Sequence, residues 1–404
     1  MTPAVYADFA RAYVTEVGHA VRRMLTRGTE AVDLLTKATA DGGVVRAFGN
    51  GGSSAIVRSA LLQLHTGAGL PVNDAMMSPA TMAYTAQNYR HVFALPLARD
   101  IDRVDLVVVA SVSGRSANIC EAVRLCADNR VPVLALVGGD GTQMEPADGL
   151  VWATGTTDQQ ISEDAMLTAL TLAAAALDPH EEPLPARQER HLHALSAVDT
   201  GALGGFLREA TEAVADAIRS RRRIYVLCPD GGPLALAGEH FAHNLSWDAP
   251  LGVEDVQPPL IVSDPSLADM SAIYNDHPDP AYGVCYQLSS ASPQDVVFLL
   301  SYDSAGRTTR EAVSAAEAAG TRLFLLHRDG PGRSGAGPRH FRLPQVDDFA
   351  LAALAQSVAH LLCRTTRAAL AADHGGPAAG LSPRDLMARD LAPLRELSDT
   401  PQSL

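Results

Sequence analysis

Two turns in the first half of the chain carry residue types that bind phosphate. Residues 49–53 read GNGGS and residues 111–118 read SVSGRSAN, and each stretch follows an apolar run and precedes a helical pattern. At such a strand-to-helix turn, backbone N–H groups and hydroxyls converge at a helix N-terminus, where phosphate and similar anions bind. The plainer interpretation is that glycine shapes the turns and serine caps the helices. Two hydroxyl-rich turns at one sheet edge exceed what capping needs, and we therefore predict phosphate binding.

The second half of the chain repeats this order in a damaged form. Residues 224–232 read IYVLCPDGG and residues 296–307 read VVFLLSYDSAGR. Pro229 follows Gly49 by 180 positions (229 − 49), and Ser301 follows Ser111 by 190 positions (301 − 111). Because the offset nearly persists across two landmarks, the pattern indicates a tandem duplication. The second copy lacks the asparagine and serine of the first turn, and Asp303 adds a negative charge, so we expect phosphate only in the first copy.

The elements that position these turns alternate between apolar strands and helices. We predict strands over residues 44–48, 70–72, 106–110, 131–137, 224–227, 260–262, 296–300 and 322–326. Helices are predicted over residues 6–39 (with a break near 26–28), 54–64, 117–129, 162–177, 203–219, 235–245, 308–319 and 349–369. Short apolar strands without alternation, separated by helices, are typical of a parallel sheet buried on both faces. We expect one domain over residues 1–180, a proline- and charge-rich linker over 181–201, a second domain over 202–370 and a tail over 371–404.

Composition limits the classes of protein to consider. The 404 residues are 47% hydrophobic and 5% aromatic, enough for two globular domains, and the formal net charge is -14. No block of lysine or arginine stands out, which argues against nucleic-acid and membrane-surface partners. No apolar run approaches the roughly 20 residues of a membrane span, and the N-terminus lacks a signal pattern. The five scattered cysteines indicate reduced thiols, and we expect a soluble cytoplasmic protein.

With both copies in view, the chain resembles two fused sugar-isomerase (SIS) domains of the phosphoheptose isomerase type. GNGGS and SVSGRSAN match the two turns of that family, in order and about 60 residues apart. Residues 263–266 (SDPS) and 272–277 (AIYNDH) resemble the family's central Asn-Asp segment, and the likeness spans residues 5–370. The resemblance implies two flavodoxin-like α/β/α domains with parallel sheets and a bound sugar phosphate. The residues implied to bind it are Asn50, Gly51, Gly52, Ser53, Ser111, Val112, Ser113, Gly114, Ser116 and Asn118.

The catalytic positions of the family are only partly filled. Aldose–ketose isomerisation moves a proton between adjacent carbons through an enediol, which needs a base and an acid. The resemblance implies a His and a Glu four residues apart in the helix after the first turn, and a Gln and a His in the last helix. The residues there are Ser59, Gln63, Ser162 and Leu170 in the first copy, and His240, Asn244, Ala352 and His360 in the second. A histidine in an apolar helix also suits a core role, so both interpretations of His240 and His360 stay open.

Active sites of this family lie near subunit contacts, so the resemblance implies a composite site. The first copy would hold the phosphate, and His240 and His360 of the second copy would serve the sugar. Glu163 and Glu239 are the preferred candidates for the base, although Glu163 also suits a helix cap. Further candidates are His65, Glu254 and Asp255. Two histidines without a carboxylate make an incomplete zinc site, so we predict no metal and no cofactor.

Two functions remain open on these residues. One is a phosphosugar aldose–ketose isomerase, with sedoheptulose 7-phosphate as the candidate substrate; the other is a non-catalytic sugar-phosphate-binding or regulatory protein. Loss of the family's Glu in both copies favours binding, whereas the two histidines favour the enzyme, which we prefer. We also expect a homodimer of two-domain chains, because Ala/Leu faces over residues 167–177 and 350–362 would recreate the family's four-domain assembly.

Overall fold

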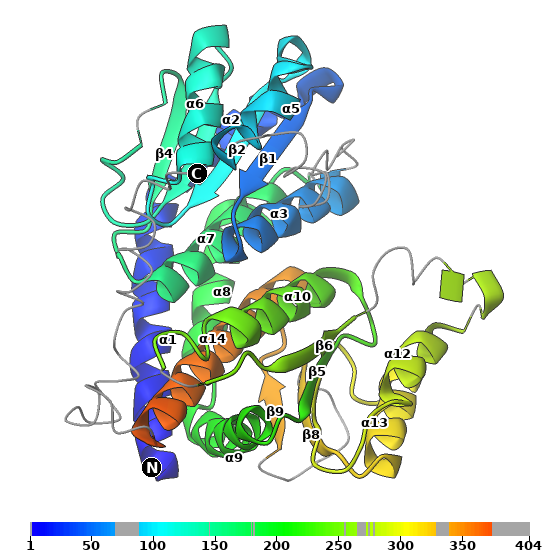
Figure 1. The fold of residues 1–404 in the computed structure, drawn as a ribbon. Coiled ribbons are helices and arrows are strands. Elements are labelled where there is room, and N and C mark those ends of the chain that lie inside the picture. The colour runs from blue at the N-terminus through cyan, green and yellow to red at the C-terminus, as the bar shows by residue number, and fades with distance from the viewer. Residues whose placement is uncertain are drawn as a thin grey trace. The chain divides into compact units, whose positions relative to one another are not determined.

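The computed structural model describes residues 2–68, 89–144, 146–178, 180, 182–253, 256–264, 272–273, 275–277, 279–328 and 339–373. The chain forms two compact units (Figure 1). Among the described residues, the N-terminal unit comprises residues 16–192, and the C-terminal unit comprises residues 2–15 together with 193–373. Each unit is built around its own parallel sheet.

The sheet of the N-terminal unit has the strand order β1-β2-β3-β4, and every pair is parallel. Its strands are β1 (Val45–Gly49), β2 (Leu106–Ser111), β3 (Val133–Val137) and β4 (Gly149–Ala153). Helices α2 (Gly28–Thr39), α3 (Gly52–Ala68) and α7 (Gln159–Ala175) pack together on one face, while α5 (Ala94–Ala98) and α6 (Ala117–Asn129) pack on the other. All residues of β2 and β3 are buried, because helices cover both faces of these strands.

The described part of the C-terminal unit repeats the pattern with five parallel strands in the order β6-β5-β7-β8-β9. They are β5 (Arg223–Leu227), β6 (Leu260–Ser263), β7 (Val296–Ser301), β8 (Arg322–Arg328) and β9 (His340–Leu343). Helices α9 (Thr200–Arg219), α10 (Gly232–Trp247) and α14 (Asp348–Asp373) group on one face, and α12 (Pro280–Leu288) and α13 (Arg307–Ala318) on the other. Numbered along the chain within this unit, the order is 2-1-3-4-5, the flavodoxin-like arrangement, which confirms the predicted fold class.

Two of the described helices lie outside this repeat. Helix α1 (Pro3–Leu25) contributes its first residues, up to Thr15, to the C-terminal unit and the rest to the N-terminal unit. Its end at Leu25 and the start of α2 at Gly28 confirm the predicted break near residues 26–28. Helix α8 (Leu184–Ser196) lies in the segment that the sequence suggested as a linker. Three short 3-10 helices complete the described elements, at Ala40–Gly42, Tyr89–His91 and Ile101–Arg103.

The sequence located most strands but missed two of them. Strands β4 and β9 were not predicted, because each is short and has only alternate residues buried rather than a continuous apolar run. The strand predicted over residues 70–72 and the tail beyond residue 373 lie outside the described residues. Within the described part of the chain, no helix has the length and apolar character needed to cross a membrane.

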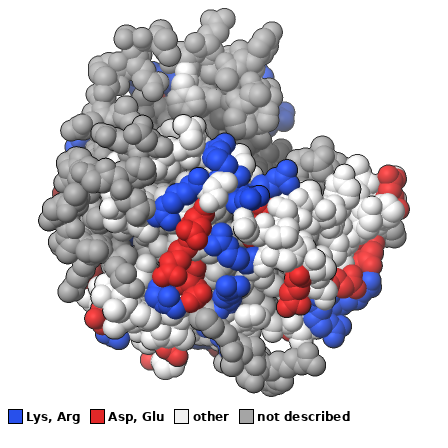
Figure 2. Space-filling view, turned by 60° about the horizontal axis from the view of Figure 1, so that its bottom comes forward, with Lys and Arg blue, Asp and Glu red and all other residues white. Residues whose placement is uncertain are grey.

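Charged residues are mixed in sign over the surface that Figure 2 displays, where acidic and basic side chains lie side by side. Exposed ion pairs of this kind include Arg11 with Asp8 and Arg124 with Asp128. Such exposed pairs contribute little to stability.

Candidate functional site

The two predicted phosphate turns lie at the carboxyl ends of β1 and β2, which are neighbours in the sheet. Ligands of open α/β sheets bind at this edge of the sheet. Glycine is required at two points of these turns. Gly51 and Gly114 have φ values of 49° and 64°, a region that residues with a Cβ rarely adopt. A side chain at Gly114 would also come within 3.1 Å of Gln143.

Two of the predicted residues join the turns to each other. The side-chain amides of Asn50 and Asn118 exchange hydrogen bonds of 3.0 and 2.8 Å, and Asn118 is 2% exposed. The hydroxyl of Tyr89, which sequence reasoning did not find, donates to Asn50 Oδ1 at 2.9 Å. The paired hydrogen bonds between Asn50 and Asn118 therefore hold the two turns at a fixed spacing. The Asn50 oxygen is fully used, because it accepts from both Asn118 and Tyr89.

The side chains of the serines in the second turn do not cap helix α6. Ser116 is the N-cap residue of α6, yet its side chain makes no capping hydrogen bond and lies 3.2 Å from the Ser111 hydroxyl. Ser113 is exposed, and its hydroxyl accepts from the Arg115 N–H at 3.2 Å. The Gly114 N–H donates to the Ser111 carbonyl at 3.0 Å, so it closes the turn and is not available to an anion. Three hydroxyls thus gather at a helix start, whose first amides have no acceptor within the helix.

In the corresponding turns of the C-terminal unit, the side chains of the turns themselves accept hydrogen bonds from the donors there. Asp230 Oδ2 accepts from the Ser301 hydroxyl at 2.7 Å and from the Tyr302 N–H at 2.9 Å. The Tyr302 hydroxyl accepts from the Leu234 N–H at 2.9 Å, at the start of α10. Burial raises the pKa of Tyr302 well above its usual range, so the phenol stays neutral. Asp303 instead accepts from the Ala305 N–H at 2.8 Å within its own turn. The carboxylate that reaches across the turns is therefore Asp230 rather than Asp303.

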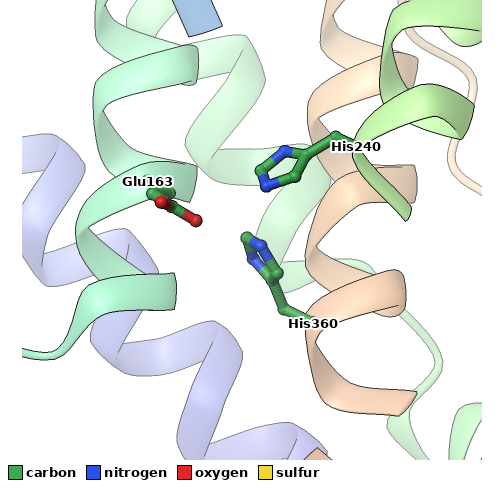
Figure 3. Close-up of side chains that lie close together, drawn as sticks. All are labelled: Glu163, His240 and His360. Carbon is green, nitrogen blue, oxygen red and sulfur yellow. The ribbon is translucent and has the colours of Figure 1, made fainter. Parts of the chain in front are cut away.

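The two candidate histidines of the C-terminal unit face each other (Figure 3). His240 on α10 and His360 on α14 are 2% and 0% exposed, and their rings meet edge to face with centroids 5.1 Å apart. His240 Nδ1 lies 2.8 Å from Gln356 Oε1, and His360 Nδ1 lies 3.4 Å from the Tyr13 hydroxyl. Arg364 stacks over the Tyr13 ring at 5.2 Å from its centroid. The pair therefore belongs to a buried polar cluster and is not surrounded by apolar side chains alone.

Gln356 is the residue that sequence reasoning missed here. The Gln position of the last helix was given to Ala352, whereas the structure places Gln356 beside His240. The signal was present, since Gln356 precedes His360 by four residues and so shares a helix face with it. An amide oxygen can only accept, so Nδ1 of His240 carries the proton and Nε2 is its basic nitrogen. The imidazole nitrogens of His240 and His360 are the groups of this cluster whose type is suited to ligating a metal ion.

The candidate bases differ in their surroundings. Glu163, labelled in Figure 3, is carried by α7 of the N-terminal unit and is 3% exposed, with Gln159 Nε2 3.5 Å from its Oε1. The capping role at α7 belongs to Asp158, which accepts from the Ile161 N–H. Glu239 is exposed although its neighbour His240 is buried, and His65 is also exposed. Glu254 and Asp255 lie outside the described residues.

The positions that the first copy offers for catalysis are structural. Ser162 donates to the Thr156 carbonyl at 3.0 Å and fixes the loop before α7. Ser59 and Leu170 are buried in α3 and α7, which pack against each other. A separate pocket of about 290 Å³ lies beside α12 and contains none of the predicted site residues. Its lining is His277, Asp279, Ala281, Tyr282, Cys285 and Glu311.

Comparison with known proteins gives sequence relatives for the N-terminal part of the chain and structural neighbours for nearly all of it. Residues 6–138 match the family model of the SIS domain. Phosphoheptose isomerase of Rhodospirillum rubrum is 28% identical over 142 residues, which are 33% of this chain and 76% of that protein. A putative phosphosugar isomerase of Clostridium difficile has a TM-score of 0.57 at 12% identity, over 93% of this chain and 94% of its own. The C-terminal domain of glucosamine-fructose-6-phosphate aminotransferase from Francisella tularensis has a TM-score of 0.53 at 12% identity, over 87% and 96%.

The two parallel sheets, each covered by helices on both faces, define a protein of two α/β/α domains. The family model covers the first copy, and the two structural neighbours share the fold across nearly the whole chain. Residues 6–138 of this chain therefore match the SIS domain and are related in sequence to phosphoheptose isomerases, and the C-terminal unit repeats the parallel α/β arrangement of the N-terminal unit. At this low sequence identity, the likeness to the structural neighbours establishes the fold alone. The function therefore has to be argued from the site itself.

Proposed function

We propose that this protein is a phosphosugar aldose–ketose isomerase whose N-terminal unit binds the phosphate group. The observation that carries the proposal is the hydroxyl cluster of Ser111, Ser113 and Ser116 at the start of α6, none of which caps the helix through its side chain. Hydroxyls and amides at a helix N-terminus suit a phosphate ester, because the helix dipole and the N–H groups both favour an anion. Sedoheptulose 7-phosphate is the substrate we propose, on the likeness to phosphoheptose isomerases.

Acid–base chemistry is assigned to the buried histidines. The Gln356 oxygen fixes the tautomer of His240, so His240 presents a basic Nε2, while His360 is held through its Nδ1 near the Tyr13 hydroxyl. We propose that these imidazoles move protons between the sugar oxygens. Glu163 is our preferred base for the proton on carbon, because it is a carboxylate at a buried position, where desolvation strengthens a carboxylate as a general base. This proposal requires the two copies to share one substrate. Glu239 is less suitable because it is exposed.

A second candidate function is a non-catalytic sugar-phosphate sensor. The observation that favours it is the residue set at the family's base positions, where Gln63 and Asn244 are both amides that cannot remove a proton. Under this hypothesis the N-terminal unit binds the ligand, and the buried histidine cluster only stabilises the C-terminal unit. We also propose that two chains associate into a homodimer.

Proton NMR of sedoheptulose 7-phosphate with the protein in D2O distinguishes the two functions. The isomerase incorporates deuterium at the carbon next to the carbonyl, because the abstracted proton exchanges with solvent. A sensor binds the compound in calorimetry without any incorporation. A protein that neither binds nor exchanges contradicts both proposals.

A further inference from the structure

Asp230 occupies in the C-terminal unit the position that Asn50 occupies in the N-terminal unit. The two residues are 180 positions apart (230 − 50), which is the offset of the duplicated first turns. Helices α3 and α10, which follow them, begin at Gly52 and Gly232 with the same offset. Each of the two side chains connects the first turn of its unit to the second turn. The chemistry at the shared position differs, because an amide both donates and accepts whereas a carboxylate only accepts.

The Asn50 amide bonds to another amide, and the serines stay separate from it. Asn50 and Asn118 satisfy each other, while the Ser111 hydroxyl lies near the Ser116 hydroxyl. No negative charge from these four side chains enters the turn. The hydroxyls of the N-terminal unit therefore remain donors for an anion that arrives from solution.

The Asp230 carboxylate accepts hydrogen bonds from the equivalent donors of the C-terminal unit. Ser301, which corresponds to Ser111, donates its hydroxyl to Asp230 Oδ2, and the Tyr302 N–H donates to the same oxygen. The Thr309 hydroxyl lies 3.5 Å from Asp230 Oδ1 and 2.7 Å from the Ser301 hydroxyl, and both hydroxyl residues are buried. One carboxylate thus receives a backbone amide and a buried hydroxyl at the turn between a strand and helix α13. These are the ligands that a phosphate would use at such a turn.

We infer that the residue at positions 50 and 230 determines whether a unit accepts an external anion, and that Asp230 is the internal anion of the C-terminal unit. Its negative charge satisfies the donors of the turn and repels phosphate. Asp303 does not share this role, because its carboxylate accepts from Ala305 within the same turn. The inference concerns the C-terminal unit and does not depend on the proposed isomerase activity.

The test uses the full-length chain carrying Ser113→Asp, so that binding to the N-terminal unit is blocked. Inorganic phosphate is titrated by calorimetry into this parent, into the parent with Asp230→Ala and into the matched control with Asp303→Ala. We expect the Asp230→Ala protein to gain one phosphate site per chain and the other two to gain none. Phosphate should also raise the melting temperature of the Asp230→Ala protein alone, because the anion replaces the missing carboxylate.

Asp230→Ser is the second variant if Asp230→Ala fails to fold, and the same gain is expected. No added site in a folded Asp230 variant, or an equal gain in the Asp303→Ala control, would overturn the inference. Failure of the proposed function has a different signature: the wild-type protein would incorporate no deuterium into sedoheptulose 7-phosphate, or would bind no phosphate ester at all, while the Asp230 variant still gains its site. The converse exchange, Asn50→Asp in the wild type, should abolish phosphate-ester binding.

Discussion

At the scale of single residues, the two units use similar turns in opposite ways. The N-terminal unit keeps three serines and two neutral amides at the ends of β1 and β2. The C-terminal unit retains Ser301 but adds the Asp230 carboxylate and the Tyr302 phenol. Asp230 accepts from the Tyr302 N–H of the turn, and the Tyr302 hydroxyl accepts from the Leu234 N–H at the start of α10. We infer that a few side-chain exchanges at one sheet edge separate a turn that accepts an external anion from one that does not.

Replacing Ser113 with Asp should abolish sugar-phosphate binding. The new carboxylate would stand at the start of α6, where it satisfies the helix N-terminus and repels the phosphate. Isothermal titration calorimetry with sedoheptulose 7-phosphate measures the effect. Asp303→Ala is the matched control, and it should bind the ligand as the wild type does. Equal losses in both variants would contradict the assignment of phosphate to the N-terminal unit.

Replacing His360 with Gln should reduce turnover more than stability. Glutamine keeps the hydrogen-bonding capacity toward Tyr13 but cannot titrate, so we expect kcat to fall by about 10²-fold or more, the usual scale for a lost general acid. The melting temperature should stay nearly unchanged. Tyr13→Phe, which removes only the partner hydroxyl, should have a smaller effect on kcat. A variant that melts much earlier yet turns over normally would show that His360 is a core residue.

At the scale of elements, the start of α1 is fixed to α9 by a close approach of backbones. A Cβ at Gly204 would lie 2.6 Å from both the Ala7 nitrogen and the Pro3 carbonyl oxygen. The next residue, Gly205, has no neighbour within 4 Å of such a Cβ among the described residues. Glycine is therefore needed at the first of these positions for packing, and is only a poor helix former at the second.

These adjacent glycines give a matched pair of opposite predictions. Gly204→Ala should lower the melting temperature, because the contact with backbone atoms of α1 cannot be relieved by moving a side chain. Gly205→Ala should be neutral or stabilise by up to about 1 kcal/mol through helix propensity alone. Thermal unfolding followed by circular dichroism measures both. Stabilisation of both variants would show that the N-terminal part of α1 does not pack closely on α9.

At the scale of the whole molecule, the basis for expecting a dimer has changed. The Ala/Leu faces of the last helices were expected to bind a second chain. In the structure, residues 167–175 of α7 and 350–362 of α14 are buried within a single chain. A second chain must therefore use another surface. Trp247 at the end of α10 and Tyr286 on α12 are 54% and 59% exposed and are candidates for it.

We expect light scattering at micromolar concentration to give a mass of at least two chains of 42.5 kDa. The expectation rests on the preference of soluble oligomers for closed two-fold symmetry and on the exposed aromatic residues. Trp247→Glu should weaken association if that surface is used, because a charge would replace an aromatic contact. A wild-type mass of one chain would contradict the dimer outright.

The sequence by itself determined the features that depend on local patterns. Continuous apolar runs located β2 and β7, and the helix over Ala117–Asn129 was predicted with its observed bounds. The repeated turns, 180 and 190 positions apart, indicated the duplication, and the glycines and serines of the first copy predict an anion site that remains a proposal. These signals are readable because strand, turn and helix preferences act over a few neighbouring residues.

Only the tertiary structure decided which side chains meet. Asn50 and Asn118 are 68 positions apart, Asp230 and Ser301 are 71 apart, and His240 and Gln356 are 116 apart. Asp230 carries no local signal of its role, and Asp303 was the more obvious carboxylate in the sequence. The spacing of Gln356 from His360 indicates a shared helix face, but only the fold places Gln356 beside His240. The hydrogen bonds of a polar side chain are set by which strands and helices become neighbours, and that depends on the packing of the whole unit. Chemistry-bearing residue types are therefore visible in the sequence, whereas their partners follow from the fold.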